Sequence, residues 1–310
     1  MKLHEYQYEF KDLISIVASK LHIPESAVER DYYIVLLLKN LENSAYADKC
    51  VFKGGTSLSK CYPGSIERFS EDIDLTFLGM ELSDKACDKS IKQIEAIMTE
   101  GAQTDKITAE RSNRSKSMYV WFANEENKIK LEIGSSIRLD PYSKKTFKSY
   151  IHEFLEEQGA EDDMQKFELA SVTLNVLHIE RTFIDKIMSV KRHAICESLD
   201  KKVRHIYDVT RLFTLPEIQT FLNNKAELKR LIQATKETDS YYLEKRGISK
   251  NYNPIEAYNF NFWKHYLNPQ IRMRYESLHE DLLYTDEKQN FEDALATFVE
   301  IDSILKEIGE

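Results

Sequence analysis

The sequence is poor in the residues that break helices and make tight turns. Its 310 residues contain 9 glycines and 6 prolines, about 5% of the chain against a usual ~12%. This scarcity argues against a many-turned β-sandwich and predicts a helix-rich protein. The four cysteines, Cys50, Cys61, Cys87 and Cys196, are widely spaced and form no CxxC pair, which excludes both a disulfide framework and a structural zinc site.

Long apolar runs are also missing. The longest, Ile34 to Leu38, is far short of the ~20 residues that span a bilayer. The first 13 residues lack a basic segment followed by an apolar one, so no secretory signal is expected. We therefore predict a cytoplasmic protein that does not enter a membrane.

Charge is unevenly distributed along the chain. The net charge of −9 argues against a general nucleic-acid coat. Residues 276–310 carry 11 acids and 2 bases, which accounts for the whole −9, whereas residues 181–211 carry 8 bases and 4 acids, net +4. The second segment predicts a local basic face.

The length predicts about two domains, and the order of the predicted helices and strands indicates the fold class of each domain. Apolar spacing predicts helices from Phe10 to Leu21 and from Pro24 to Leu41. β-branched and aromatic runs predict strands at 50–53, 73–77, 118–123, 129–133 and 172–177, with a hairpin around 124–127. Helices are expected near 85–99 and 145–158, and almost everything beyond Glu180 follows helical period. The fold is therefore α+β, a mixed sheet with packed helices followed by a helical bundle.

The most informative stretch runs from Val51 to Phe77. Gly54 and Gly55 close a strand and precede Thr56 and Ser57, so backbone N–H groups and two hydroxyls are expected to approach a phosphate at a helix start.

Two carboxylates follow on the next strand. Asp72 and Asp74 lie two residues apart, which places both on one face, about 7 Å apart, where they can share divalent cations. Ile73 and Leu75 then point into a core. Acid-x-acid pairs also occur without function in a chain with 52 acids, as at Glu161 and Asp163, but that pair has no glycine turn before it.

A glycine turn followed by an Asp-x-Asp strand is the arrangement of nucleotidyltransferases, in which two magnesium ions align an attacking oxygen with an α-phosphate. A third acid usually comes from a neighbouring strand, and Glu132 in KIKLEIG is the candidate. Other phosphate and catalytic motifs, GxGxxG, GxxxxGK[ST], HExxH and HRD, are absent.

Four strings, found in order from Glu29 to Leu212, resemble the AbiEii/AbiGii-type nucleotidyltransferase toxins of bacterial abortive-infection and toxin–antitoxin systems. They are ERDYYIVLLL, FKGGTSLSK with ERFSEDIDL, ERTFIDKIMSVKR and RHIYDVTRL. One departure is His205, which stands where many members have an acid.

The resemblance implies a DNA-polymerase-β-like palm at residues 1–178 and a helical bundle at 179–310. It implies a nucleoside triphosphate, magnesium (two ions), often an RNA acceptor such as tRNA, and a possible cognate antitoxin. Carried over by motif, Gly55, Thr56 and Ser57 would hold phosphates, Asp72 and Asp74 would bind metal, and Lys186 and Asp208 would be the essential pair of the helical part. The residues themselves add Glu132 as the candidate third metal ligand, and Gly54, Lys186 and Arg204 as substrate-binding candidates.

We therefore predict a magnesium-dependent nucleotidyltransferase that moves a nucleotide from an NTP to an acceptor and inhibits growth as a toxin. RNA is the favoured acceptor. The basic segment 181–211 favours RNA, since a small alcohol needs no such surface. Two alternatives stay open: a small-molecule nucleotidyltransferase of the antibiotic-modifying kind, and a catalytically silent module that binds NTP or a partner. From the residues alone, Lys186 could instead be a solvent-facing helix lysine, and Asp208 could pair with Arg204 one turn away.

Overall fold

The chain folds into two compact units. The computed structural model describes residues 2–135, 139–246, 252–278, 283, 285 and 289–310. The first unit comprises Met1–Tyr62 and Phe69–Leu177, and the second comprises Pro63–Arg68 and His178–Glu310. The sequence predicted one boundary, between residues 178 and 179. The chain passes between the units three times, after Tyr62, Arg68 and Leu177.

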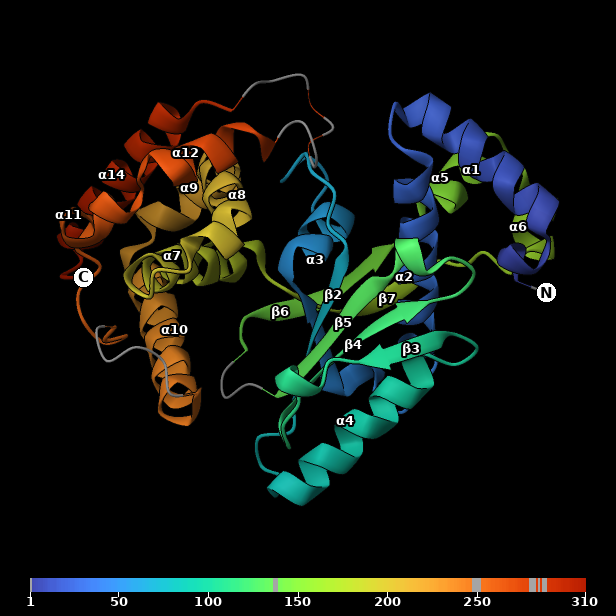
Figure 1. The fold of residues 1–310 in the computed structure, drawn as a ribbon, viewed down its shortest axis with the longest axis horizontal. Helices are drawn as coiled ribbons and strands as arrows, with labels where there is room; N and C mark the ends of the chain where they lie inside the picture. Colours follow the sequence, from blue (N-terminus) through green and yellow to red (C-terminus); the bar gives the residue numbers. More distant parts are fainter. Residues whose placement is uncertain (1, 136–138, 247–251, 279–282, 284, 286–288) are drawn as a thin grey trace. The chain divides into compact units, whose positions relative to one another are not determined.

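The first unit is built on a mixed sheet. Within the described residues it has seven strands in the order β3-β4-β5-β2-β1-β7-β6 (Figure 1). The pairs β2–β5 and β1–β7 are parallel, and the others are antiparallel. The strands are β1 (Cys50–Lys53), β2 (Asp72–Phe77), β3 (Gln103–Lys106), β4 (Ser115–Trp121), β5 (Ile129–Ser135), β6 (Tyr142–Phe147) and β7 (Val172–Leu177).

One face of this sheet carries the core. Burial alternates along β5, and in β2 the side chains of Ile73 and Leu75 are buried while those of Asp72 and Asp74 are partly exposed. Two helices, α2 (Glu25–Glu42) and α4 (Asp84–Met98), contact the sheet and each other. Their apolar residues join the buried side of the strands in one cluster, because a half-covered sheet buries every second residue.

Helices α1 (Gln7–Leu21) and α5 (Tyr150–Glu157) contact α2, and α6 (Glu161–Lys166) contacts α5 (Figure 1). The short α3 (Gly54–Cys61) follows β1 directly. The two predicted opening helices are thus confirmed, as is the 124–127 hairpin between β4 and β5. None of the described helices has the length and apolarity needed to cross a bilayer.

One expected helix was wrong in part. Residues 142–147 form β6, and only from Tyr150 does the segment become helical. As an edge strand, β6 buries only Phe147 fully, so its sequence shows little apolar alternation. The edge strand β3 was missed for the same reason, since all four of its residues are exposed.

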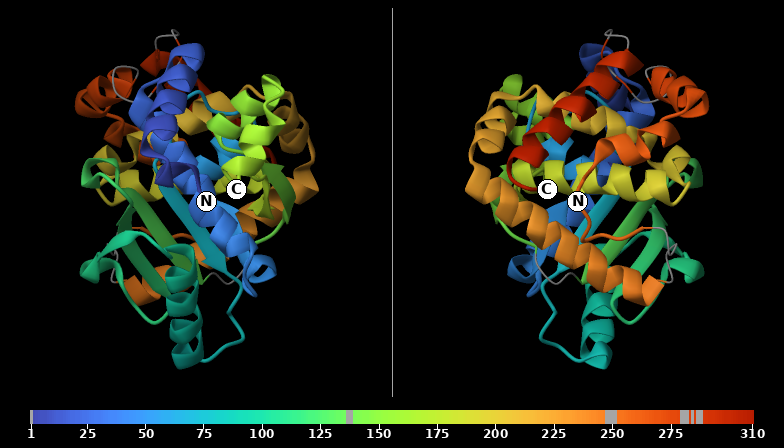
Figure 2. Two further views of the ribbon diagram at one scale, coloured as in Figure 1. Left: turned by 90° about the vertical axis from the view of Figure 1, so that its right-hand side faces the viewer. Right: turned by 90° about the vertical axis from the view of Figure 1, so that its left-hand side faces the viewer.

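The second unit is helical, as predicted. Among the described residues its α-helices are α7 (Ile179–Ile195), α8 (Val203–Phe213), α9 (Pro216–Asn223), α10 (Lys225–Arg246), α11 (Phe260–Trp263), α12 (Pro269–Glu276) and α14 (Phe291–Glu307). Helix α8 contacts α7, α9, α12 and α14, and the right-hand view of Figure 2 shows α10 as a long orange helix. Ile206, Val209 and Leu212 of α8 are fully buried, so this helix contributes to the core of the bundle.

Candidate active site

The glycine turn lies against one of the two predicted metal-binding carboxylates. Gly54 begins α3 with a φ of +82°, and a Cβ built on it would lie 2.1 Å from Oδ2 of Asp74. Only glycine satisfies both the left-handed backbone and this close approach. The turn and Asp74 therefore form one structural element, although 20 residues separate them in sequence.

The two hydroxyls after the glycines are used inside the turn. The Thr56 hydroxyl donates to the backbone carbonyl of Asp72 and lies 3.0 Å from the Ser70 hydroxyl. The Ser57 hydroxyl donates to the carbonyl of Gly54 at 3.0 Å, and both side chains are buried. What this turn offers to a ligand is its backbone: the first N–H groups of an α-helix have no partner within the helix.

The carboxylates lie as the alternation predicted. Asp72 and Asp74 share the partly exposed face of β2, and Asp74 is in register with Glu132 on the parallel neighbour β5. Lys53, at the end of β1, is the register partner of Asp74 on the other side. Lys53, Asp74 and Glu132 thus stand in one row across three strands.

Glu132 has a basic neighbour on its own strand. Lys130, in register with Asp72, forms ion pairs with Glu132 and, at 2.8 Å, with Glu110. Burial by itself would lower the pKa of Lys130, but these two carboxylates raise it above its usual value, so the ammonium stays charged. The third predicted metal ligand is therefore held by a lysine in this conformation.

A divalent cation fits this face through its aspartates. Among the described residues, no three His, Cys, Asp or Glu side chains are grouped to hold a metal ion. Magnesium does not require such a cage, because it usually binds through one or two carboxylates together with substrate phosphates and water. Asp72 and Asp74 provide two such carboxylates, beside a turn whose first N–H groups have no partner within the helix.

Three bases lie near the glycine turn in sequence, Lys53, Lys60 and Arg68, and two of them are bound by carboxylates of the protein. Lys60 pairs with Asp31 at 2.8 Å, and Arg68 pairs with Asp208. For Lys53, no carboxylate of the described residues lies within ion-pair distance, 4.0 Å. Lys53 is therefore the flanking base best able to meet a phosphate.

The second unit brings Lys186 and Asp208 together with Arg68. Nε and Nη2 of Arg68 donate to the two oxygens of Asp208 at 2.6 and 2.8 Å, and Nζ of Lys186 donates to Oδ2 at 2.6 Å. Asp208 is 0% exposed. Burial alone would raise its pKa, but Arg68 and Lys186 hold it well below its usual value, so the carboxylate is ionised.

This cluster decides between the alternatives that the sequence left open for Lys186 and Asp208. Lys186 is 5% exposed and so does not face solvent, and Asp208 pairs with Arg68 and Lys186 instead of Arg204. Arg204 lies one turn earlier on α8 and is partly exposed. No sequence signal identifies Arg68 as the partner, because 140 residues separate it from Asp208.

His205 lies beside the same cluster. Its Nδ1 is 3.1 Å from the Ser189 hydroxyl. Burial, reinforced by the charge of Lys186, lowers the pKa of His205 well below its usual range. The imidazole is therefore neutral near pH 7, so this departure from the family pattern adds no charge beside Asp208.

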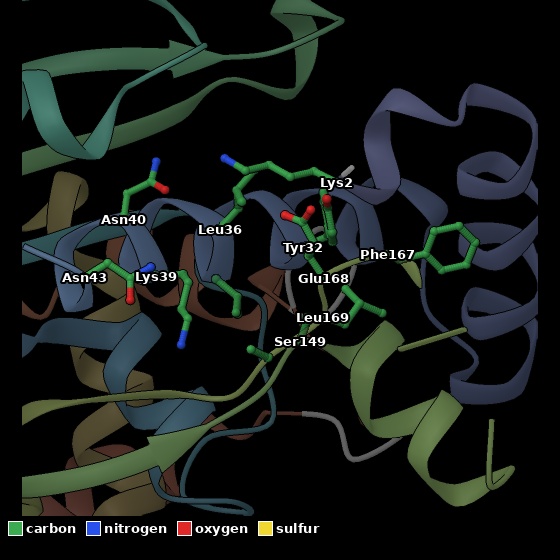
Figure 3. A pocket seen from close by; sticks show the side chains of 12 residues that line it. Lys2, Tyr32, Leu36, Lys39, Asn40, Asn43, Ser149, Phe167, Glu168 and Leu169 are labelled. Atoms are coloured by element: carbon green, nitrogen blue, oxygen red, sulfur yellow. The ribbon is translucent and has the colours of Figure 1, made fainter. Parts of the chain in front are cut away.

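A separate cavity of about 240 Å³ lies between α2 and residues 167–170 (Figure 3). Its lining includes Tyr32, Lys39, Asn40 and Phe167 and none of the predicted site residues. The Lys39 ammonium donates to Glu42 and to the carbonyl of Ser171. The cavity thus has no connection to the predicted chemistry.

Comparison with known proteins gives one matching family model and two similar solved structures. The family model described as nucleotidyl transferase AbiEii toxin, type IV toxin–antitoxin system, matches residues 36–297. A similar solved structure is MenT4, a nucleotidyltransferase toxin from Mycobacterium tuberculosis, with a TM-score of 0.52 and 17% identity over 95% of this chain and 98% of that one. JHP933 from Helicobacter pylori also aligns, with a TM-score of 0.39 and 17% identity over 83% of this chain and 95% of that one.

No curated protein sequence matches the chain. The MenT4 likeness supports the fold, and the family model, which covers well over half of the residues, establishes the family. The protein belongs to the AbiEii nucleotidyltransferase toxin family of type IV toxin–antitoxin systems.

Proposed function

We propose that the protein moves a nucleotide from an NTP to an RNA acceptor in a magnesium-dependent reaction, and that this transfer makes it a toxin. The observation that carries the proposal is the contact of the Gly54 turn with Asp74, on the strand that also carries Asp72 and beside Glu132 on β5. This combination joins an anion-binding helix start to hard carboxylate ligands. Membership of a type IV toxin–antitoxin family also implies an antitoxin partner.

The first unit supplies the groups for binding and for chemistry. The N–H groups at the start of α3 and the ammonium of Lys53 bind the phosphates of the NTP. Asp72 and Asp74 hold the metal, with Glu132 as the further acid once Lys130 releases it. Bound magnesium would neutralise charge on the phosphates and lower the pKa of the attacking hydroxyl.

We assign Asp208 a positioning role. With no exposed surface and three charge-assisted hydrogen bonds, it acts through Arg68 and Lys186. Arg68 ends the 63–68 segment, and Asp72 follows four residues later. The buried pair thus fixes Arg68, at the end of that segment, against α8 within the second unit.

The acceptor assignment depends on a few bases of segment 181–211. Most of its bases are taken up internally: Arg181 pairs with Asp185, Arg192 with Asp239 and Arg211 with Glu67, and Lys191 is buried against backbone carbonyls. Lys201 is exposed and Lys202 and Arg204 are partly exposed. These three are the bases we propose for RNA contact.

The direct test is to incubate the protein with magnesium, each NTP labelled at the α-phosphate, and one of three acceptors: total RNA, a protein extract or a set of small alcohols. Label in RNA is expected, and none with Asp74→Asn. Label on small alcohols or on protein would assign another class of acceptor, and label on none of them would refute the proposed nucleotide transfer.

A second test addresses the RNA surface. Replacing Lys201, Lys202 and Arg204 together by Ala should weaken RNA binding and reduce its salt slope by about 1 for each phosphate that the protein no longer neutralises. NTP affinity should not change unless Arg204 contacts the substrate, which Arg204→Ala alone would reveal. Removing three bases of α10, at positions 225, 229 and 230, is the matched control. Equal RNA affinities and slopes in both variants would exclude segment 201–204 from acceptor binding.

A further inference from the structure

Three consecutive charged residues near the start of α2 each contact a different segment of the candidate site. Glu29 accepts a hydrogen bond from the side-chain amide of Asn127, Arg30 pairs with Glu71, and Asp31 pairs with Lys60. All of these residues belong to the first unit. After Asp31 the helix continues with buried apolar side chains that fix it to the core.

The Asp31 contact anchors the glycine-turn helix. The Asp31 and Lys60 side chains are 7% and 4% exposed, and their charged atoms are 2.8 Å apart. The other oxygen of Asp31 accepts from the backbone N–H of Tyr150 at 2.7 Å, and the Lys60 ammonium lies 4.1 Å from the centroid of the Tyr150 ring. Lys60 is in the last turn of α3, whose first residue is Gly54, so this pair fixes the far end of the phosphate-binding helix.

The other two contacts anchor the strands. Glu71 directly precedes Asp72, the first residue of β2. Asn127 ends the turn that leads into β5, five residues before Glu132. The three contacts thus reach the helix with the turn, the strand with the two aspartates and the strand with the third acid.

We propose that Glu29, Arg30 and Asp31 form a positioning site that sets these three segments in register for nucleotide transfer. The proposal rests on the proposed function. Apolar packing alone is non-directional, whereas an ion pair fixes both distance and orientation. Because displacement of reacting groups by about 1 Å can cost on the order of 100-fold in rate, removing one of these three interactions should lower kcat more than it raises KM.

The sharpest test uses Arg30 and Glu71. Their side chains are 15% and 42% exposed, so the charges can be exchanged without burying a new one. Arg30 Nε is buried without a hydrogen-bond partner, so Glu71 is the anchor of this side chain. Arg30→Glu and Glu71→Arg should each lower kcat at least tenfold, and the double exchange should recover most of the loss.

The matched control is the exposed pair Lys20–Glu157 between α1 and α5, where Lys20→Glu, Glu157→Lys and their combination should leave kcat and KM unchanged. Asn127→Ala, in an exposed turn, gives a variant with little risk of misfolding and should lower kcat severalfold. Melting temperature is recorded for every variant.

The results separate the two proposals. If the wild-type protein transfers label but Arg30→Glu and Asn127→Ala keep its kcat, the positioning site is refuted and the proposed function stands. A folded double exchange that stays as inactive as the single variants also refutes it. If the wild-type protein transfers no label from any NTP, the proposed function fails, and the positioning site fails with it.

Discussion

Replacing Asp208 by Asn tests whether the buried cluster of the second unit is a structural requirement. The substitution keeps the shape of the side chain but removes the negative charge that Arg68 and Lys186 share. Two cations then remain beside a neutral amide with no exposed surface. Breaking a buried pair from one side costs about 3–5 kcal/mol, because the partner charge stays buried and uncompensated.

Three observed hydrogen bonds support that magnitude. They are 2.6, 2.8 and 2.6 Å long, and a hydrogen bond to a charged group contributes about 1.5–3 kcal/mol. The amide oxygen of Asn can still accept one or two of them, which brings the net loss back to the same range. A loss of this size is a large part of the roughly 5–15 kcal/mol of a typical native state.

The assay is urea unfolding of wild-type and variant proteins, monitored by far-UV circular dichroism, beside the transfer reaction. Glu67→Gln is the matched control, because Glu67 is the neighbour of Arg68 in the same segment but pairs with Arg211 at 2.7 Å with 36% of its side chain exposed; we expect a loss below about 1 kcal/mol there. Equal stabilities of Asp208→Asn and Glu67→Gln would refute the reasoning. Lys186→Met added to Asp208→Asn should restore part of the stability.

The remaining predictions concern the metal ligand, the glycine turn, the phosphate-binding lysine and the pH dependence of stability. Asp74→Asn should abolish transfer without changing the melting temperature, since a metal ligand acts on the chemical step; a variant with near-wild-type turnover contradicts the metal site. Gly54→Ala should abolish transfer by displacing Asp74. The control is Gly64→Ala, because Gly64 is also at positive φ but a Cβ there would have nothing within 4 Å; it should cost only backbone strain of about 1–2 kcal/mol. Similar transfer kinetics for the two variants would exclude the steric argument. Lys53→Met should raise the KM for NTP about tenfold with a smaller change in kcat, and an unchanged KM would remove this lysine from phosphate binding. The folded-state pKa of Asp208 is lowered from an unfolded value near 3.9. The stability that its charge contributes is therefore complete above about pH 4 and decreases as the pH falls toward the folded pKa, so the stability difference between wild type and Asp208→Asn should narrow at pH 3. A difference that stays constant argues against an ionised Asp208.

Features that repeat with the period of a helix or a strand could be predicted from local sequence patterns. Period-2 alternation placed Asp72 and Asp74 on the open face of β2 and Ile73 in the core, as burial in the structure confirms. Helical spacing identified α1 and α2, and the glycine pair marked the start of α3. Such patterns are reliable because burial repeats with the period of the element itself.

Where burial is incomplete, the local pattern failed. For the edge strand β6 the sequence pattern predicts part of a helix, because only Phe147 is fully buried and the strand shows little apolar alternation. The polar strand β3 showed no alternation at all. An edge strand is defined by backbone hydrogen bonds to a partner far away in sequence, which its own side chains do not record.

The partners of the charged side chains could not be predicted from local sequence patterns. Nothing in the local sequence indicates the partner of Arg68, which is buried against Asp208, 140 residues away. Segment 181–211 read as a basic face, yet most of its bases pair within their own unit. An ion pair depends on which side chains packing brings within about 4 Å, and for residues this far apart in sequence only the folded chain sets that distance.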